Sequence, residues 1–563
     1  MSRLSFNLMV FLFFILSACT TPEEETKLIA KGGRVYGGNV AYYASEKSGP
    51  IFPMAGVSMY DQRASAPVFE TLLAYNEEDQ KLVSNLIKDY AFSTDNSYVD
   101  LKIRNGVYFH PDPCFNNGFG RLTATDVKFT IDFACSSHHL NRQGHLLTSK
   151  IMGAAEFTKD KGCDFNQGVS GVKVLSDSVL RLSLLDSTQT ILKILTHQSL
   201  SVISRRAYDF YGEKIPEHPI GTGPFIFNQK TKANLLFTRN PKYWKRDSYN
   251  NALPFLDTLT IKFKKVGQDI FKSFASQNTD LLSSIPINEI NSLFGTLIDA
   301  QEGKNILHKV QYKKGLKVNY LEFDCSRPPF NDPNLRRAIY HAVDRQQICR
   351  EFLYGEGSPA ELGVLPSVPF FSYTGRTMNP YNMRLAKSHL RKSSYKIGDT
   401  ISFYVNSIEG SPEDQWCNSL VNHLDKNLNL QLKLVHVSFM DKMNMIEKGE
   451  AAMWKTAYIS DYPDAESFLM PYYSKNKEVR TLNMNNFSNK EFDNNLDASR
   501  GEEDPSKRNE YFNSCVNILN REAPIVPLYF EDLVVVINLR LRGAQVNSFG
   551  ILDLSRAYLK PIQ

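Results

Sequence analysis

The sequence predicts a mixed α/β protein with several domains, and three observations support this prediction. The chain has 563 residues, far more than one hydrophobic core holds, so roughly two to four domains are expected. Hydrophobic residues make up 42% and charged residues 22%, as in an ordinary globular protein. Strand and helix patterns alternate along the chain, without a short repeat or a low-complexity linker.

The N-terminus has the pattern of an exported, lipid-anchored protein. After Arg3 comes an apolar run at 8–16, much shorter than the roughly 20 residues that a bilayer span needs. It ends in the letters LSAC, which resemble a bacterial lipobox whose cysteine receives a diacylglycerol. We expect a lipoprotein signal peptide at 1–19 ending at the lipidated Cys19, then a polar tether at 20–30. The alternative is a secretory signal with a chance cysteine.

The body of the protein is therefore expected outside the cytoplasm, anchored by lipid on a bacterial membrane and facing the periplasm or the cell exterior. No later segment approaches the length of a membrane span. Thr20 resembles an outer-membrane sorting signal, whereas the acids at 23–25 suit surface display. The sequence therefore does not decide which membrane holds the anchor.

Strands and helices follow in order along the mature chain. Residues 97–109 alternate apolar and polar side chains around an Asn-Gly turn, and 123–135 begin with a Thr/Asp cap and continue at helical spacing. A hairpin is expected at 171–185, and strands at 220–229 and 255–265.

The second half continues the alternation. Residues 332–355 predict one helix, with an Asp-Pro start and a glycine after its end. A strand at 399–407, a helix at 413–428 and a strand at 430–439 follow.

Eight cysteines are present, and seven remain beyond Cys19. None forms a C-x-x-C pair, and their wide spacing suits either scattered buried thiols or isolated disulfides. The odd number leaves at least one free thiol if all pairing is within the chain. They are Cys114, Cys135, Cys163, Cys325, Cys349, Cys417 and Cys515.

Several chemistries have no support in the sequence. A net charge of +5 over this length argues against a nucleic-acid partner. The chain has no G-x-S-x-G, H-E-x-x-H or Walker A motif, so no enzyme, cofactor or metal site is expected. His138 and His139 are interpreted as a solvated helix end, because neighbours on a helix point in different directions.

A series of segments spans nearly the whole mature chain in a fixed order. It includes "HPIGTGPFIFNQ" (218–229), "FTRNPKYWKRD" (237–247) and "YISDYPDAESFL" (458–469). The others are 68–110, 122–133, 328–348, 381–390, 485–499 and 523–530. The series resembles the family 5 extracellular solute-binding proteins, which are the dipeptide and oligopeptide receptors of ABC importers. By themselves, the Gly-Thr-Gly-Pro and Arg-Asn-Pro segments are interpreted as turns without chemistry.

The resemblance implies a fold like that of the type II periplasmic binding proteins, with two hinged lobes and a domain inserted in the first. The expected parts are lobe 1 (27–74, 200–285 and 525–563), the inserted domain (75–199) and lobe 2 (286–524). A solute would be held between lobes that close on it.

The resemblance also implies a site in the stretch "WKTAYISDYPD". In peptide-binding relatives the matching aspartate accepts the α-ammonium of the peptide, and here this residue is Asp461. Lys455 would help to neutralise a ligand carboxylate, and Tyr458 would wall a side-chain pocket. Tyr462 is a further candidate for the role of Tyr458.

A structural interpretation competes with this site. Asp461 suits the cap of a helix that begins near Pro463, and Asp464 and Glu466 would then lie exposed in the first turn.

The expected function is a lipid-anchored, monomeric receptor that passes short peptides to an ABC permease. Two alternatives stay open: the same receptor for a glycan, a nickel complex or haem, and a surface hydrolase on this scaffold.

Overall fold

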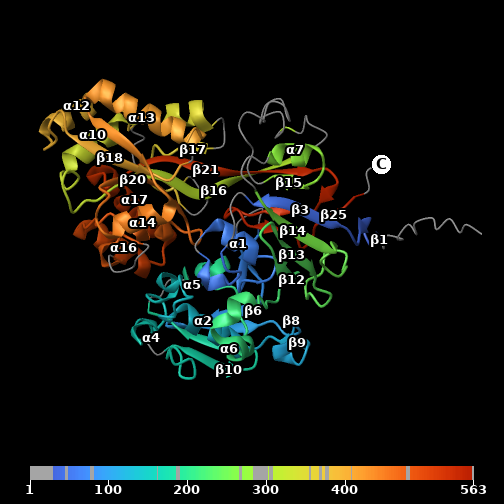
Figure 1. Cartoon of the computed structure of the whole chain (residues 1–563). Coiled ribbons are helices and arrows are strands. Elements are labelled where there is room, and N and C mark those ends of the chain that lie inside the picture. Colours follow the sequence, from blue (N-terminus) through green and yellow to red (C-terminus); the bar gives the residue numbers. More distant parts are fainter. Residues whose placement is uncertain are drawn as a thin grey trace, which may run out of the picture.

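Two long antiparallel strands, β16 (His308–Phe323) and β21 (Ile525–Asn538), run side by side between two groups of elements (Figure 1). They lie in the middle of the largest sheet. In order across that sheet, its strands are β12 (Phe225–Lys230), β13 (Asn234–Arg239), β14 (Thr258–Phe263), β3 (Asn39–Ala44), β15 (Leu281–Leu282), β21, β16, β20 (Met453–Ile459), β18 (Thr400–Val405) and β19 (Gln431–His436), and β17 (Gly357–Pro359) pairs with β21.

The computed structural model describes most of the chain. The described residues are 29–44, 49–56, 58–76, 81–160, 163–185, 190–264, 269–282, 302, 308–353, 357–366, 371–374, 380–407, 409–476 and 482–560. Cys19, the expected signal peptide and nearly all of the expected tether lie outside them. Among the described residues, no helix combines the length and the apolar character needed to cross a bilayer.

The large sheet is mixed: β12, β13 and β14 pair antiparallel at one edge, and parallel pairs lie on both sides of the long strands. β14 pairs in parallel with β3, and β18 pairs in parallel with both β19 and β20. β16 and β21 each pair antiparallel with their neighbours. Since all other strands of the sheet lie on one side or the other, these two strands join its two halves.

The ladder between β16 and β21 is interrupted at one place. Lys313 pairs with Leu533 and Lys317 pairs with Glu531, so three residues of β16 lie opposite one residue of β21. A Cβ added to Gly315 in this bulge would lie 2.1 Å from the Glu531 carbonyl oxygen, so the close approach of the two backbones requires glycine.

Gly315→Ala is expected to lower the free energy of unfolding by about 1–3 kcal/mol, because backbone atoms cannot move aside as a flexible side chain can. Gly501→Ala is the matched control, since no atom of the described part of the chain lies within 4 Å of its added Cβ. Urea unfolding of both variants measures the difference. Equal stabilities would show that the bulge has room for a side chain.

A smaller sheet lies within the segment expected as the inserted domain. Its order is β10 (Val172–Ser176), β11 (Val179–Ser183), β7 (Tyr98–Ile103) and β6 (Ile87–Phe92), all antiparallel. Five two-stranded ladders complete the strands: β1 (Ile29–Ala30) with β2 (Arg34–Val35), β4 (Leu73–Tyr75) with β5 (Leu82–Ser84), β8 (Tyr108–Asp112) with β9 (Gly118–Arg121), β22 (Leu541–Arg542) with β25 (Tyr558–Leu559), and β23 (Gln545–Val546) with β24 (Leu552–Asp553).

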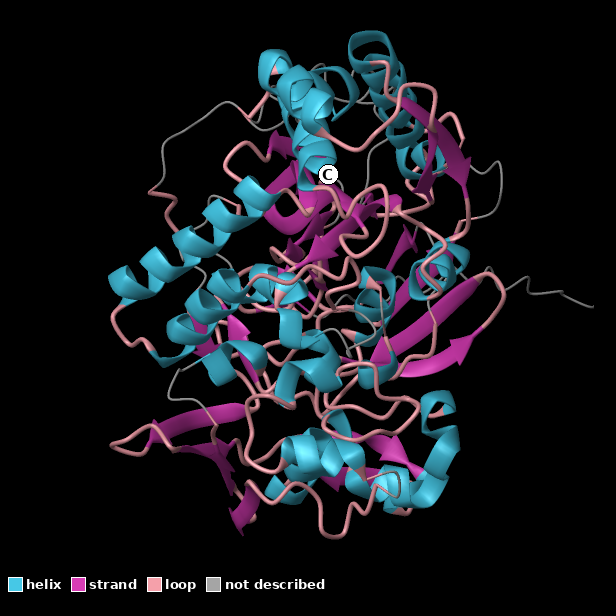
Figure 2. Cartoon of the chain, turned by 90° about the vertical axis from the view of Figure 1, so that its left-hand side faces the viewer, coloured by secondary structure: helices cyan, strands magenta, loops and turns pink. Residues whose placement is uncertain are grey.

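Figure 2 shows the molecule from the left-hand side of Figure 1, with the strands at the centre and helices around and in front of them. Those before β16 are α1 (Met59–Ser65), α2 (Ala124–Ala134), α3 (Gly144–Leu147), α4 (Ala154–Lys159), α5 (Thr190–Ile194), α6 (Arg205–Tyr211) and α7 (Ile270–Ala275). Those after it are α10 (Pro333–Ala342), α11 (Arg345–Ile348), α12 (Met383–Lys392), α13 (Pro412–Leu428), α14 (Phe439–Glu447), α15 (Ala465–Leu469), α16 (Lys490–Gly501) and α17 (Pro505–Glu522).

Most sequence-predicted elements are present, but the helix expected at 332–355 is interrupted. It ends at Ala342, because Val343 is extended and Asp344 caps a second helix by accepting a hydrogen bond from the Gln347 amide. The buried Arg345 side chain donates to the Val343 carbonyl oxygen at 3.2 Å and so stabilises the break. None of the seven described cysteines is joined in a disulfide, so the isolated disulfides are not formed.

Candidate functional site

A cavity of about 570 Å3 lies between segments expected in different domains. Its volume falls within the range of small-molecule sites. Most of its lining comes from the segments expected in lobe 1 and the inserted domain, whereas Leu316, Asp461 and Pro463 come from the segment expected in lobe 2. The charged and titratable side chains around it include Glu70, His197, Lys245, Asp461, Asp553 and Arg556, and the aromatic ones include Tyr42, Phe69, Tyr75, Phe225, Tyr243 and Phe549.

Asp461 follows the end of β20 and faces two histidines of the inserted domain. Its carboxylate accepts a hydrogen bond from the Tyr458 hydroxyl at 2.7 Å. Nε2 of His145 lies 3.5 Å from Oδ2, and Nε2 of His197 lies 3.8 Å from Oδ1. The amide of Asp461 donates to the Ser467 hydroxyl at 2.9 Å, which fixes the backbone at this point.

The surroundings keep Asp461 ionised. Burial raises the pKa of Asp461, but the hydrogen bond and charge of His145, with smaller contributions from His197 and Tyr458, outweigh it, and the pKa lies below its usual value. Burial lowers the pKa of His197 to about 4, so this ring is neutral at pH 7. His197 therefore does not neutralise the Asp461 carboxylate, whose nearest side-chain partners are Tyr458 and His145.

The other three sequence-predicted residues are described but do not line the cavity. Tyr458 acts on it indirectly, through its hydrogen bond to Asp461. Lys455 is buried in β20 and forms an ion pair with Glu413 in the first turn of α13. Tyr462 is 4% exposed and packs into the large apolar core of the segments expected in lobe 1 and the inserted domain, although it lies in the segment expected in lobe 2.

The helix-cap interpretation of Asp461 is wrong. Helix α15 begins at Ala465, and its cap is Asp464, whose Oδ1 accepts a hydrogen bond from the Glu466 amide at 3.0 Å. Asp461 lies three residues before this cap. Its side chain is therefore free of any capping role.

Asp464 and Glu466 are buried, so the expectation that they lie exposed is also wrong. Their exposed fractions are 1% and 0%. Four cations surround them, as buried carboxylates require. Lys193 and Arg508 contact Asp464 at 2.5 and 2.8 Å, and Lys150 and Arg500 contact Glu466 at 3.0 and 2.7 Å.

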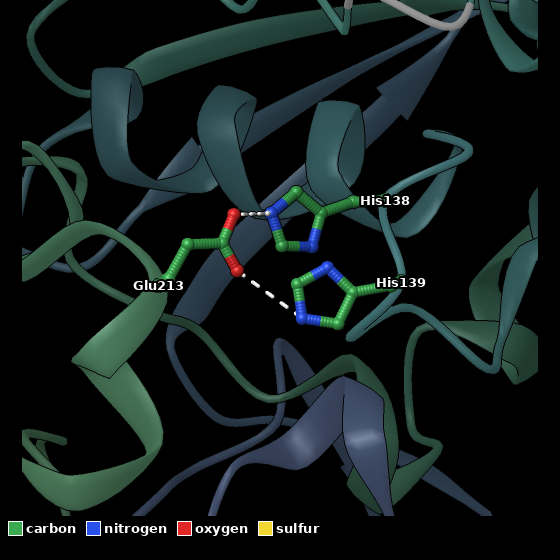
Figure 3. Close-up of side chains that lie close together, drawn as sticks. All are labelled: His138, His139 and Glu213. Carbon is green, nitrogen blue, oxygen red and sulfur yellow. Dashed lines mark hydrogen bonds and ion pairs between the residues drawn. The ribbon is translucent and has the colours of Figure 1, made fainter.

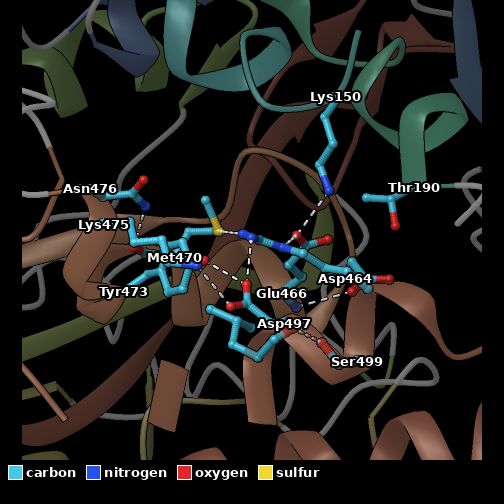
Figure 4. A network of polar contacts seen from close by, with 12 residues as sticks. Lys150, Thr190, Asp464, Glu466, Met470, Tyr473, Lys475, Asn476, Asp497 and Ser499 are labelled. Atoms are coloured by element: carbon cyan, nitrogen blue, oxygen red, sulfur yellow. Dashed lines mark hydrogen bonds and ion pairs between the residues drawn. The ribbon is translucent and has the colours of Figure 1, made fainter. Parts of the chain in front are cut away.

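This ionic cluster joins two of the expected domains. Lys150 and Lys193 belong to the segment of the inserted domain, whereas both carboxylates and both arginines belong to that of lobe 2. Figure 4 shows Lys150 reaching toward Glu466 from a separate ribbon. The close packing of the two domains therefore depends partly on charge.

The cluster predicts a loss of stability in acid. Burial raises the pKa of Glu466, but the charges of Lys150 and Arg500 outweigh this effect. The net result is a pKa lowered from 4.5 to about 2. Because folding depresses this pKa, the stabilisation is complete above pH 4.5 and is lost as the pH falls toward 2. Thermal midpoints of the wild type and Glu466→Gln should therefore converge across this window. A constant difference down to pH 2.5 would contradict this assignment.

Sequence analysis missed Glu70, which is 6% exposed at the cavity wall. Its carboxylate accepts hydrogen bonds from Thr222 at 2.9 Å, Tyr243 at 2.9 Å and Trp244 at 2.8 Å, and Lys245 lies 3.2 Å away. The two segments interpreted as turns without chemistry thus converge on one acid. A glutamate inside the apolar run "VFETLL" was the signal that could have revealed it.

The glycines of the Gly-Thr-Gly-Pro segment allow a close approach of two backbones. A Cβ at Gly221 would lie 2.0 Å from the Val68 carbonyl oxygen, and one at Gly223 would lie 2.5 Å from that of Pro67. The segment is thereby held against the residues just before Glu70.

Comparison with known proteins identifies the family. The family model of the bacterial extracellular solute-binding proteins, family 5 Middle, matches residues 81–479. The chain belongs to this family. Members are binding proteins, and the matched region includes Asp461 and both carboxylates of the ionic cluster, Asp464 and Glu466.

Relatives of this family 5 protein cover almost its whole length. Heme-binding protein A of Haemophilus influenzae is 22% identical over 552 residues, which are 95% of each chain. The peptide transport periplasmic protein SapA of the same species is 21% identical over 595 aligned positions, with 99% of each chain covered. The periplasmic binding protein DppA of Helicobacter pylori, solved with the peptide STSA, matches with a TM-score of 0.78 and 18% identity over 94% of this chain and 99% of that one. The family 5 protein therefore has the fold of the type II periplasmic binding proteins.

Proposed function

We propose that this protein captures short peptides between its lobes and delivers them to the permease of an ABC importer. In this proposal Asp461 pairs with the α-ammonium of the peptide. The observation that carries it is an ionised aspartate beside a neutral His197 at the wall of a cavity between domains. A charge-assisted hydrogen bond in such a place is roughly twice as strong as a neutral one.

The opposite end of the peptide has its own partners in the cavity. Arg556 and Lys245 both line it, and Lys245 already lies beside Glu70. We assign the neutralisation of a peptide carboxylate to Arg556, whereas Lys245 already pairs with Glu70 and Lys455 pairs with Glu413. Tyr458 keeps the Asp461 carboxylate in place.

Closure on the peptide would bend the molecule at the bulge between β16 and β21. The carbonyl oxygen of Leu316 in this bulge accepts a hydrogen bond from the Ser460 amide at 2.9 Å, one residue before Asp461. Leu316 also lines the cavity. A peptide held by Asp461 would therefore act directly on the bending point, and the pairs Lys150–Glu466 and Lys193–Asp464 would hold the closed form.

We also propose that Cys19 carries the lipid that holds the monomeric receptor on the membrane. The lipobox-like letters LSAC support this. Labelling of cells with a radioactive fatty acid should mark the wild type and not Cys19→Ala. Equal labelling of both would reject the anchor.

A second candidate is haem. The relative named heme-binding protein A covers 95% of this chain, and His197 at the cavity offers a nitrogen ligand for iron. Titration calorimetry with a mixed library of di- to pentapeptides tests the first proposal, and absorption spectroscopy with haem tests the second. Micromolar peptide binding without a haem spectrum is expected. Haem binding with no response to any peptide would overturn the peptide assignment.

A further inference from the structure

A second cluster of ligand-type side chains lies in His138, His139 and Glu213. The two histidines follow α2 in a loop, not on a helix, so the reason for expecting them to point apart does not apply. Their rings stack, with centroids 4.7 Å apart and an angle of 25° between the planes. Glu213 comes from the 3-10 helix η4 (Gly212–Glu217).

The three side chains converge on one point. Nε2 of His138 lies 3.0 Å from one carboxylate oxygen of Glu213, and Nε2 of His139 lies 3.1 Å from the other. Figure 3 shows the carboxylate facing the edges of both rings. One ligand atom from each residue lies within 4.8 Å of the other two.

The His138 ring is held ready for this role. Its Nδ1 accepts a hydrogen bond from the Leu140 amide at 3.2 Å, which leaves Nε2 as the atom that faces Glu213. Phe133 packs on the ring at 4.8 Å, and the Tyr208 hydroxyl lies 3.3 Å from Nε2. The side chain is 8% exposed, so the surrounding packing sets its orientation.

The other two ligands can adjust. The side chains of His139 and Glu213 are 68% and 63% exposed, so both can move by the small distance that brings three donors to about 2.0–2.2 Å from one ion. Water can fill the remaining positions. Two imidazoles and one carboxylate suit a borderline divalent transition metal, whereas Ca2+ and Mg2+ prefer oxygen ligands.

We propose that His138, His139 and Glu213 form a surface site for a divalent transition-metal ion such as Zn2+. On binding, Nε2 of each ring exchanges its proton for the metal, and the protons pass to water. The ion would connect the loop after α2 to η4. This site is separate from the cavity that contains Asp461 and does not depend on the proposed peptide function.

Titration of the purified full chain with ZnCl2 against a fluorescent chelator tests the proposal. We expect one Zn2+ per chain, and at least a tenfold loss of affinity in both His139→Ala and Glu213→Gln. Both positions are exposed, so these variants should fold, as circular dichroism would verify. His436→Ala is the matched control, because His436 also pairs with a carboxylate, Asp414 at 2.7 Å, but belongs to no group of three possible ligands among the described residues.

A second measurement uses stability. Zn2+ should raise the thermal midpoint of the wild type and of His436→Ala, but not that of His139→Ala. The absence of stoichiometric binding by the wild type would overturn the proposal. So would Zn2+ binding that is unchanged in both His139→Ala and Glu213→Gln.

Discussion

Replacing Glu466 with glutamine is expected to lower the free energy of unfolding by about 3–5 kcal/mol. The side chain is fully buried and contacts Lys150 at 3.0 Å and Arg500 at 2.7 Å. Glutamine keeps the shape but removes the charge, so the buried ammonium of Lys150 loses this carboxylate. Since desolvated cations depend on such partners, the loss should far exceed that of an exposed pair.

The control is an ion pair of similar length on the surface. Glu491 lies 2.8 Å from Arg521, and their side chains are 60% and 53% exposed. Glu491→Gln should change the stability by less than about 1 kcal/mol. Urea titrations of both variants give the comparison. Similar losses in the two variants would mean that burial adds nothing to the cluster.

Asp461→Asn is expected to weaken peptide binding by about 2–5 kcal/mol, while the thermal midpoint changes little. The substitution removes the negative charge but leaves a side chain of the same shape beside Tyr458 and His145. Calorimetry with a peptide that binds the wild type measures the effect. An unchanged affinity would remove Asp461 from the binding site.

A modified ligand provides an independent check on the same contact. Acetylation of the peptide N-terminus removes the ammonium. The loss of affinity of the wild type for the acetylated peptide should therefore equal the loss that Asp461→Asn causes with the unmodified peptide. The two losses should not add, because each removes the same pair. Fully additive losses would show that the ammonium binds elsewhere.

Local patterns predicted much of the fold. The Thr-Asp cap of α2 is confirmed, since Thr123 and Asp126 form a reciprocal capping box, and the hairpin expected at 171–185 is present as β10 and β11. These features depend on residues close in sequence. The break after Ala342 was missed because it depends on a side chain that packs against a distant strand: Arg345 donates to the Pro527 carbonyl oxygen.

The candidate site shows the same limit. The resemblance predicted Asp461 as a site residue but not its histidine partners. His145 and His197 lie more than 260 residues earlier in the chain. Likewise, Glu466 was expected in water because its partner Lys150 is 316 residues away in sequence. Charges in an apolar segment indicate that a partner exists, but only the tertiary structure shows which residue provides it.

In the proposed closure, the bulge between β16 and β21 would set how the lobes move. The two strands run side by side from one half of the sheet to the other. Their pairing is interrupted at one level, between Lys313 and Lys317 on β16 and between Leu533 and Glu531 on β21. In the proposed closure, a double connection of this kind would favour bending about one axis over torsion between the halves. The two lobes would thus open and shut along one repeatable path, and each empty receptor would return to the same geometry before its next encounter.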